Sequence, residues 1–391
     1  MVPKGWSEIT LGQLTTVITS GSRDWAQYYA ETGSKFIRMT NLNRHGIHLL
    51  LDDMKFVNIK SNSSDGKRTS LNEGDILCSI TAELGKIGWI PSNFGEAYIN
   101  QHTALIRIDR KKADSKFIAY QLSSSKLNKT LNSLNDAGAK AGLNLSTIKS
   151  IPIHYPPLAE QQKIAQILST WDKAIAVTEQ LLANSQQQKK ALMQQLLTSK
   201  KRLLDENGVR FEGEWKLTEL NSLLDYHQPT PYLVASTEYD DKYEIPVLTA
   251  GKTFILGYTN EKSGIYQDSL PVIIFDDFTT DSKFVDFPFK VKSSAMKILT
   301  AKKGASIKYV FEAMRMLKFT VGGHQRHWIS IFSNLVIPIP KSHEQQKIAK
   351  VLSTADQEIE ALQRKLDGLQ QEKKALMQQL LTGKRRVKVA A

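Results

Sequence analysis

The chain is poor in cysteine and in long hydrophobic runs. Its 391 residues contain one cysteine, Cys78, which excludes an internal disulfide framework and a cysteine-based zinc site. No apolar run approaches the roughly 18 residues that a membrane-spanning helix requires. The first ten residues, MVPKGWSEIT, lack the apolar segment of a signal peptide. We therefore expect a cytoplasmic protein that does not enter a membrane.

Motifs of cofactor chemistry are also missing. No glycine-rich fingerprint follows a predicted strand, as binding of a dinucleotide or S-adenosylmethionine would require, and no Asn/Asp-Pro-Pro-Tyr/Phe motif of an amino-methyltransferase occurs. The stretch AGKT at 250–253 resembles the end of a phosphate-binding loop, but Pro246 stands where that loop needs a glycine. We predict that the chain carries no catalytic residue, metal site or cofactor of its own.

Positive charge is the main compositional signal. The formal net charge is +13 and the isoelectric point is near 9.5, which favours a polyanionic partner such as nucleic acid. Residues 1–157 carry 19 Lys and Arg against 13 Asp and Glu, whereas residues 212–340 carry 14 against 15. If the second stretch binds DNA, it must do so through local clusters rather than bulk charge.

A long internal repeat organises the chain. The word KKALMQQLLT ends at Thr198 and again at Thr382, and residues 158–203 align without a gap on residues 342–387, with 26 of 46 positions identical. Both copies are proline-free and rich in Gln, Lys, Leu and Ala, which predicts helix. The pairs Ser169/Thr170 and Ser353/Thr354 suggest caps that end a first short helix in each copy.

Apolar residues recur in alternating steps of four and three in both copies, the pattern of a coiled-coil seam. We predict that the two helices pair with each other; the alternative is that each stripe packs only on its own globular domain. The predicted seam comprises Ile164, Leu168, Trp171, Ile175, Leu182, Leu192 and Leu196 in the first copy, and Ile348, Leu352, Ile359, Leu362, Leu366, Leu369, Leu376 and Leu380 in the second.

The remaining segments read as two globular domains. Short β-like runs alternate with turns, and each segment closes on a proline-rich strand that leads into a helix, IPIHYPPLAEQQ and IPIPKSHEQQ. The predicted order is a first globule at 1–157, a helical region at 158–203, a hinge at 204–211, a second globule at 212–340 and a helical region at 341–387. This predicts an α+β protein with an antiparallel coiled coil and pseudo-twofold symmetry.

With EQQKIA and QLL words at this spacing, the whole chain resembles the specificity subunit of type I restriction-modification systems, the HsdS family. The resemblance implies two target recognition domains that read a bipartite, asymmetric site in double-stranded DNA. It also implies two modification subunits, which bring S-adenosylmethionine for N6-adenine methylation, and two restriction subunits, which bring ATP and Mg. On this interpretation the chain is a non-catalytic DNA-binding subunit, and the helix length sets the spacing between its half-sites.

Loop residues that can reach base edges or phosphates are the candidate DNA contacts, because Arg and Lys read guanine, and Asn and Gln read adenine. In the first globule they are Ser22, Arg23, Tyr28, Arg38, Asn41, Asn100, Gln101, Lys140 and Asn144. In the second globule they are Gln228, Thr230, Tyr232, Lys252, His324, Gln325, Arg326 and His327.

Two other functions remain open at this point. Asp276, Asp277, Asp281 and Lys283 in FDDFTTDSK could form a nuclease cluster, although the supporting Pro-Asp element is missing. A coiled-coil DNA-binding regulator without a methylation partner is the third possibility. His324 and His327 have no carboxylate or thiol nearby, which argues against zinc.

Overall fold

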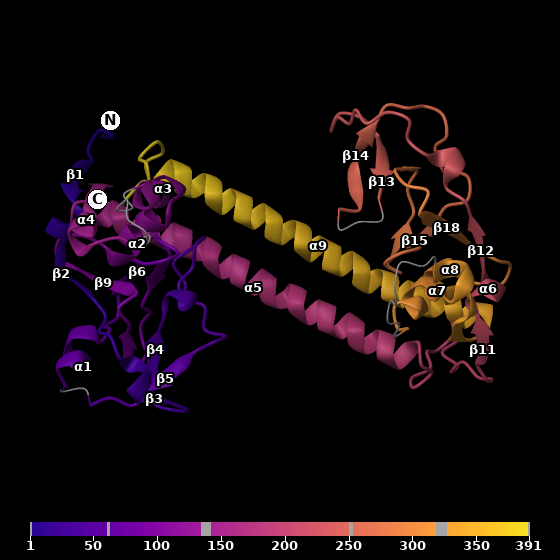
Figure 1. The fold of residues 1–391 in the computed structure, drawn as a ribbon, viewed down its shortest axis with the longest axis horizontal. Coiled ribbons are helices and arrows are strands. Elements are labelled where there is room, and N and C mark those ends of the chain that lie inside the picture. Colours follow the sequence, from indigo (N-terminus) through magenta and orange to yellow (C-terminus); the bar gives the residue numbers. More distant parts are fainter. Residues whose placement is uncertain (1, 61–62, 134–141, 250–252, 318–326, 390–391) are drawn as a thin grey trace. The chain divides into compact units, whose positions relative to one another are not determined.

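The computed structural model describes residues 2–60, 63–133, 142–249, 253–317 and 327–389. The chain divides into two compact units (Figure 1). The first unit contains Met1–Thr178 and Lys365–Ala391, and the second contains Glu179–Arg364. Each unit therefore holds one globule together with parts of both long helices. Among the described residues, no helix is long and apolar enough to cross a bilayer.

The first unit contains three sheets. Two strands pair antiparallel as β1-β10, four form the sheet β2-β9-β6-β7, and four form the sheet β3-β5-β4-β8. Their bounds are β1 Ser7–Thr10, β2 Thr15–Ser20, β3 Tyr29–Ala30, β4 Ser34–Ile37, β5 Lys55–Val57, β6 Ile76–Ser79, β7 Ile87–Trp89, β8 Ala97–Ile99, β9 Thr103–Ile108 and β10 Pro152–Tyr155. The central strands β6 and β9 are largely apolar, and they are almost completely buried.

Short helices cover this core. They are α1 Ser64–Thr69, α2 Ser115–Ser123, α3 Ser125–Ser133 and α4 Leu145–Lys149, with 3-10 turns at Leu11–Leu14, Trp25–Tyr28 and Met39–Asn41. Asp114 caps α2, because its carboxylate accepts a hydrogen bond from the backbone N–H of Phe117. Buried α2 residues such as Phe117 and Tyr120 belong to the same apolar cluster as Ile164 and Leu168 of the first long helix.

The second unit is built on the same plan. Its sheets are β11-β19, β12-β18-β15-β16 and β14-β13-β17. The strands are β11 Lys216–Glu219, β12 Leu224–His227, β13 Ile245–Leu248, β14 Ile255–Thr259, β15 Val272–Asp276, β16 Ser282–Val285, β17 Lys290–Val291, β18 Met296–Ala301 and β19 Val336–Ile339. The helices are α6 Leu220–Leu223, α7 Ile307–Met314 and α8 His327–Ser330, with 3-10 turns at Thr230–Tyr232 and Phe332–Asn334.

The strand order of the two units is closely similar, although the sheet β3-β5-β4-β8 has one strand more than β14-β13-β17. β9 lies between β2 and β6 in the first unit, as β18 lies between β12 and β15 in the second. The parallel pair β4·β8 has its counterpart in β13·β17. Helix α7 takes the place of α2 and is likewise capped by a side chain, Ser306. Two globules with little sequence in common thus share one α+β fold.

Each repeat copy forms one long helix. Helix α5 spans Leu158–Leu196 and α9 spans Ser342–Leu380, and both contain 39 residues. The expected break after Ser169/Thr170 and Ser353/Thr354 is wrong, because the helix continues through both positions. Thr170 and Thr354 donate their hydroxyl protons to the carbonyls of Gln166 and Lys350, one turn back. This bond satisfies threonine inside a helix, so the cap is not needed.

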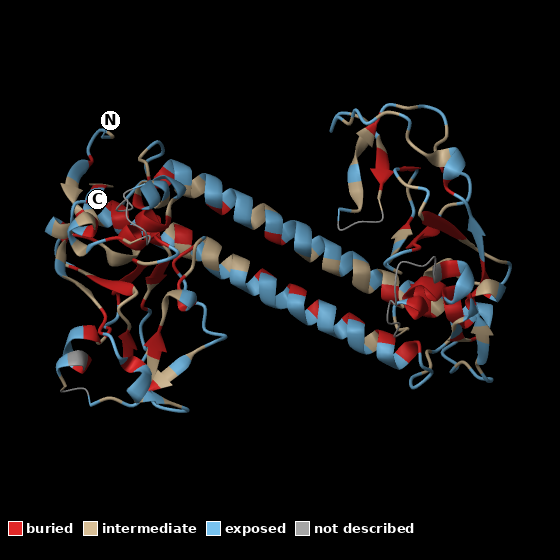
Figure 2. Cartoon of the chain, viewed as in Figure 1, coloured by how far each residue is buried: buried red, intermediate tan, exposed pale blue. Residues whose placement is uncertain are grey.

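The two helices pack side by side within each unit and run antiparallel. In the first unit, the start of α5 shares a core with Leu380 and Leu381 at the end of α9. In the second unit, the start of α9 shares a core with Met193 and Leu196 at the end of α5. The predicted seam positions of both helices are buried or half-buried (Figure 2). The seam ends also contribute to the globule cores, so pairing and packing on a globule both occur.

Both long helices end in the same backbone turn. Ser199 and Gly383 occupy the equivalent position with φ of 58° and 68°, the left-handed region. Beyond them, the N–H groups of Lys201 and Arg385 bond back to the carbonyls of Gln195 and Gln379. This is the bonding of a helix C-terminus that turns through a left-handed residue. Past α5, the predicted hinge at 204–211 forms a tight loop in which Asp205 and Val209 bond to each other.

Candidate nucleic-acid interface

Two copies of one ion pair tie the long helices together. In the first unit, the ammonium of Lys373 on α9 contacts the carboxylate of Asp172 on α5. In the second unit, Lys189 on α5 contacts Asp356 on α9, with Nζ 2.5 Å from Oδ1. Asp172 and Asp356 are equivalent in the repeat, as are Lys189 and Lys373. Each copy supplies the acid of one pair and the base of the other, as in a self-complementary interface.

A second reciprocal pair closes the helix ends. Arg386 donates to both carboxylate oxygens of Glu160, each at 2.6 Å. Arg202 grips Glu344 in the same way, at 2.6 and 2.7 Å. The two glutamates are 4% and 1% exposed. A bidentate guanidinium is the geometry that best holds a buried carboxylate, so the basic tails after each helix have a structural use.

A buried glutamine joins each long helix to its globule. The side-chain oxygen of Gln161 accepts a hydrogen bond from the N–H of Asp114, the residue that caps α2, at 2.9 Å. Gln345 accepts one from the N–H of Ser306, the cap of α7, at 2.8 Å. Their amide nitrogens donate to the carbonyls of Pro156 and Pro340. The repeated EQQ word is therefore a docking element for the globule that precedes it.

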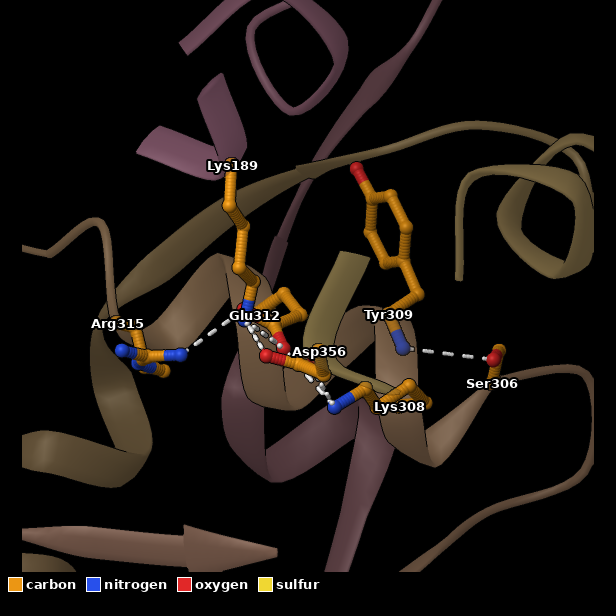
Figure 3. A network of polar contacts seen from close by, with 7 residues as sticks. All are labelled: Lys189, Ser306, Lys308, Tyr309, Glu312, Arg315 and Asp356. Carbon is orange, nitrogen blue, oxygen red and sulfur yellow. Dashed lines mark hydrogen bonds and ion pairs between the residues drawn. The ribbon is translucent and has the colours of Figure 1, made fainter. Parts of the chain in front are cut away.

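The second unit surrounds its ion pair with further charges (Figure 3). The fully buried Glu312 of α7 contacts Lys189 at 3.1 Å and Lys308 at 3.0 Å. Lys308 also contacts Asp356 at 2.8 Å, and Arg315 approaches Glu312 at 3.3 Å. Burial works to raise the pKa of Asp356, but hydrogen bonds from Lys189 and Lys308 hold that pKa below its usual value.

The first unit surrounds the equivalent pair with neutral or weakly basic groups. Tyr120 of α2 donates its hydroxyl proton to Asp172 Oδ2 at 2.5 Å, and His48 Nε2 lies 3.1 Å from the same oxygen. Burial favours a higher pKa for Asp172, but His48, Lys373 and Tyr120 together lower it to about 2. Tyr120 and Glu312 stand at corresponding helix positions, two turns after their caps.

Several candidate DNA contacts of the first globule are used inside the fold. Asn41 is 1% exposed, and its amide bonds the backbone of Arg38 and Leu50. Arg38 in turn donates to Asp53 at 2.7 Å. Buried Ser22 accepts a bond from Arg68. These three side chains hold loops in place, and Asn41 does not present its amide at the surface.

Other candidates of the first globule lie at the surface. Arg23 is exposed and Tyr28 is half-buried beside Trp25. Asn100 and Gln101 are half-buried and bond to His102. The remaining two are Asn144, whose side chain caps α4, and Lys140, which lies outside the described residues. The base-reading role of this group stays a prediction.

The first candidate stretch of each globule occupies the equivalent place in the fold. Ser22, Arg23 and Tyr28 follow β2, and Gln228, Thr230 and Tyr232 follow its counterpart β12. Gln228 and Thr230 are exposed, and Tyr232 is half-buried against Tyr266. Lys252, His324, Gln325 and Arg326 lie outside the described residues, and of His327 the backbone alone is described, at the start of α8.

The carboxylates of the acidic stretch in the second globule bond to other residues of the fold. Asp276 accepts bonds from the N–H of Phe278 and the hydroxyl of Thr279. Asp277 is 1% exposed and accepts a bond from the N–H of Trp328. Asp281 is exposed beside Lys283. Over the described residues, no three His, Cys, Asp or Glu side chains gather where they could hold a metal ion.

The polar anchors of the helices are the functional residues that the motif search missed. Glu160, Gln161 and Asp172, like their counterparts in the second copy, are identical between the copies and yet lie off the apolar seam. Identity between the copies includes these positions but does not distinguish them, because exposed residues such as Lys190 and Lys374 are identical too.

Comparison with known proteins identifies the family. The model of the type I restriction modification DNA specificity domain matches residues 3–185 and again residues 212–371. The chain belongs to this family. The two matches fall on the two halves of the duplicated chain, each taking in a globule and most of the helix that follows it.

Named relatives agree with this assignment. The chain is 52% identical over 158 residues to the EcoR124I/EcoR124II specificity subunit of Escherichia coli, which covers 39% of this chain and 38% of that protein. It is 23% identical to the MjaVIII specificity subunit of Methanocaldococcus jannaschii over 99% of this chain and 94% of the relative.

Solved structures give the same fold. The S subunit of a type I restriction-modification system from M. genitalium matches with a TM-score of 0.68 at 14% identity, covering 97% of this chain and 99% of that one. A structure described for complex assembly and conformational transition of the type I system matches with a TM-score of 0.51. The predicted two-domain α+β fold and the predicted family are therefore confirmed.

Proposed function

We propose that this chain is the DNA-reading subunit of a type I restriction-modification complex and that each globule reads one half of a bipartite target. The observation that carries the proposal is the double match of the specificity-domain model, once in each half of the chain. The two globules carry different candidate contact residues, so we infer that the two half-sites differ in sequence. The chain determines which DNA sequence the complex binds and catalyses nothing itself.

The charge distribution supports this division of labour. The first globule carries the excess of Lys and Arg, and two of its candidate stretches, after β2 and after β8, meet where Ser22 pairs with Asn100. Phosphate contacts position a protein on DNA, whereas base contacts specify the sequence. The second globule has almost no net charge, so we infer that it reads bases through fewer, more local contacts.

We propose two modification subunits and two restriction subunits as partners. The repeated helices share a run of identical exposed residues, such as Lys190 and Lys374, near their C-terminal ends, which suits binding of two copies of one partner. The modification subunits would bring S-adenosylmethionine and flip an adenine for N6 methylation. The restriction subunits would bring ATP and Mg. The cytoplasm, where the chromosome is accessible, is the compartment in which the complex would act.

The spacer between the half-sites is proposed to depend on helix length. Helices α5 and α9 are both uninterrupted over 39 residues. A chain with four residues inserted before Lys189 and four before Lys373, about one helical turn in each helix, is expected to select a longer spacer with the same half-sites. An unchanged spacer would contradict this part of the proposal.

Selection from random DNA tests the central proposal. The full chain, co-purified with the modification subunit encoded beside it, is incubated with a randomised duplex library, and bound DNA is sequenced. We expect two short, different sequence blocks separated by a constant gap. Selection of one block, or of none by an assembled complex, would favour the regulator hypothesis instead.

The nuclease hypothesis is checked in parallel: the purified chain with Mg should not cut DNA, and cutting abolished by Asp276→Ala would revive it.

A further inference from the structure

A buried lysine and aspartate lie in the second globule behind the candidate residue Gln228. Lys297 and Asp277 are each 1% exposed, and Lys297 Nζ lies 3.6 Å from Asp277 Oδ2. The same ammonium donates to the side-chain oxygen of Gln228 at 3.2 Å. The other carboxylate oxygen of Asp277 accepts a bond from the N–H of Trp328 at 2.8 Å. One buried pair therefore joins three separate segments of the chain.

The first globule has no charge at the equivalent positions. The N–H of Ile80 bonds to the residue before β9, and the N–H of Asp277 bonds to the residue before β18. Ile80 thus corresponds to Asp277. Ala104 and Lys297 are the second residues of the equivalent strands β9 and β18. Ile80 and Ala104 are buried and apolar.

Asp277 bonds to the segment at Trp328. The corresponding segment of the first globule is also hydrogen-bonded, but through a backbone carbonyl. There, the N–H of Leu143 bonds to the backbone carbonyl of Ile80 at 2.9 Å. In the second globule, the N–H of Trp328 bonds to the Asp277 side chain instead. Because an apolar pair supports the same fold, the ion pair is not required for folding. A buried ion pair is at best neutral for stability compared with apolar residues of similar volume.

The contact with Gln228 indicates what the pair is for. An ammonium group can only donate hydrogen bonds, so it fixes the side-chain oxygen of Gln228 toward Lys297. The Nε2 end is then the donor of this exposed amide. A glutamine oriented in this way can donate to an acceptor on a purine edge, such as N7, in the major groove.

We propose that Asp277 and Lys297 are positioning residues for base reading by the second globule. The pair orients the amide of Gln228 and holds the chain at Trp328 beside it. The inference rests on the proposed function. It adds that recognition of one half-site depends on a buried pair which the other half-site lacks.

The test replaces the pair by its apolar counterpart. The double variant Asp277→Ile with Lys297→Ala carries the residues of the first globule. It is assembled with the modification subunit and measured for binding to DNA in which either the first or the second half-site is altered. We expect the variant to fold with a lower melting temperature, because the buried N–H of Trp328 loses its acceptor. Discrimination at the second half-site should fall about tenfold, the size of one lost base contact, and that at the first should not change.

Retained discrimination at both half-sites would overturn the inference, since the pair would then be purely structural. If the double variant fails to fold, Asp277→Asn with Lys297→Met keeps an acceptor for Trp328 and fills the lysine volume, but removes the donor to Gln228. The same loss at the second half-site is expected, and its absence again overturns the inference. A wild-type complex that selects no bipartite DNA would be a different result, because it would overturn the proposed function itself.

Discussion

In the first unit the repeated Asp–Lys pair meets Tyr120 and His48, whereas in the second unit it meets Glu312 and Lys308. The helices thus contribute the same residues in both places, and the globules contribute unlike ones. In both units the repeated segments also form the same Glu–Arg ion pair and the same hydrogen bond from a buried glutamine. A duplicated scaffold can accept globules of different sequence if the shared contacts are made by the scaffold and by backbone groups.

Replacement of the two equivalent lysines should show the largest difference in stability between the two units. Lys189→Met leaves Asp356 with Lys308 and leaves the fully buried Glu312 with Lys308 and Arg315, so we expect a loss of about 3–5 kcal/mol in the free energy of unfolding. Lys373→Met leaves Asp172 with the hydroxyl of Tyr120 and the imidazole of His48, and should cost about 1–3 kcal/mol. Urea unfolding measures both.

The neighbouring lysines Lys190 and Lys374 provide matched controls, because both are exposed. Their replacement by Met should change stability by less than about 0.5 kcal/mol. The larger loss expected for Lys189→Met means that the second unit depends more on charged contacts than the first. Equal losses for the two buried lysines, or a larger loss for Lys373→Met, would contradict this.

Acid should destabilise the first unit by protonating Asp172. Its pKa in the folded chain is about 2, below the ordinary value of about 4. The stability that it contributes is therefore complete above pH 4 and is lost as the pH falls through 2. Asp172→Asn should lower stability at pH 7 by on the order of 2 kcal/mol and flatten the decline between pH 4 and 2. Urea midpoints at pH 7, 4 and 3 decide this; an acid decline as steep as that of the wild type would refute it.

The smallest expected effect concerns the helix ends. Ser199 adopts a left-handed conformation with a φ of 58°, which costs a side-chain-bearing residue about 1 kcal/mol. Ser199→Gly should raise stability by up to that amount. The reverse change, Gly383→Ser, should lower it by more, because a Cβ at Gly383 would lie 2.6 Å from Cγ of Pro3. Thermal unfolding of both variants checks this; a destabilised Ser199→Gly chain would be the contrary result.

Much of the scaffold could be predicted from sequence, because a gapless repeat with apolar residues in steps of four and three has few structural interpretations. The predicted break near Thr170 failed for a local reason: the threonine hydroxyl can cap a new helix or bond back within a continuing one. Residue type alone does not distinguish these two uses.

The candidate interface was less predictable. Asparagine suits a base edge as well as a backbone carbonyl, and Asn41 turned out to bond the backbone. Asp277 stands in a stretch that suggested a metal cluster, yet its partners Lys297 and Trp328 are distant in sequence. Contacts between a repeated helix and a unique globule, such as Asp172 with Tyr120, leave no pattern that a single sequence reveals.

Methylation mapping tests the central claim most directly. Cells that carry the neighbouring modification gene, with and without this chain, are compared by long-read sequencing of N6-methyladenine. One new methylated motif should appear only in cells with this chain, made of two unlike short halves and a fixed gap. No new motif from cells in which the complex assembles, or the same motif without this chain, would contradict it.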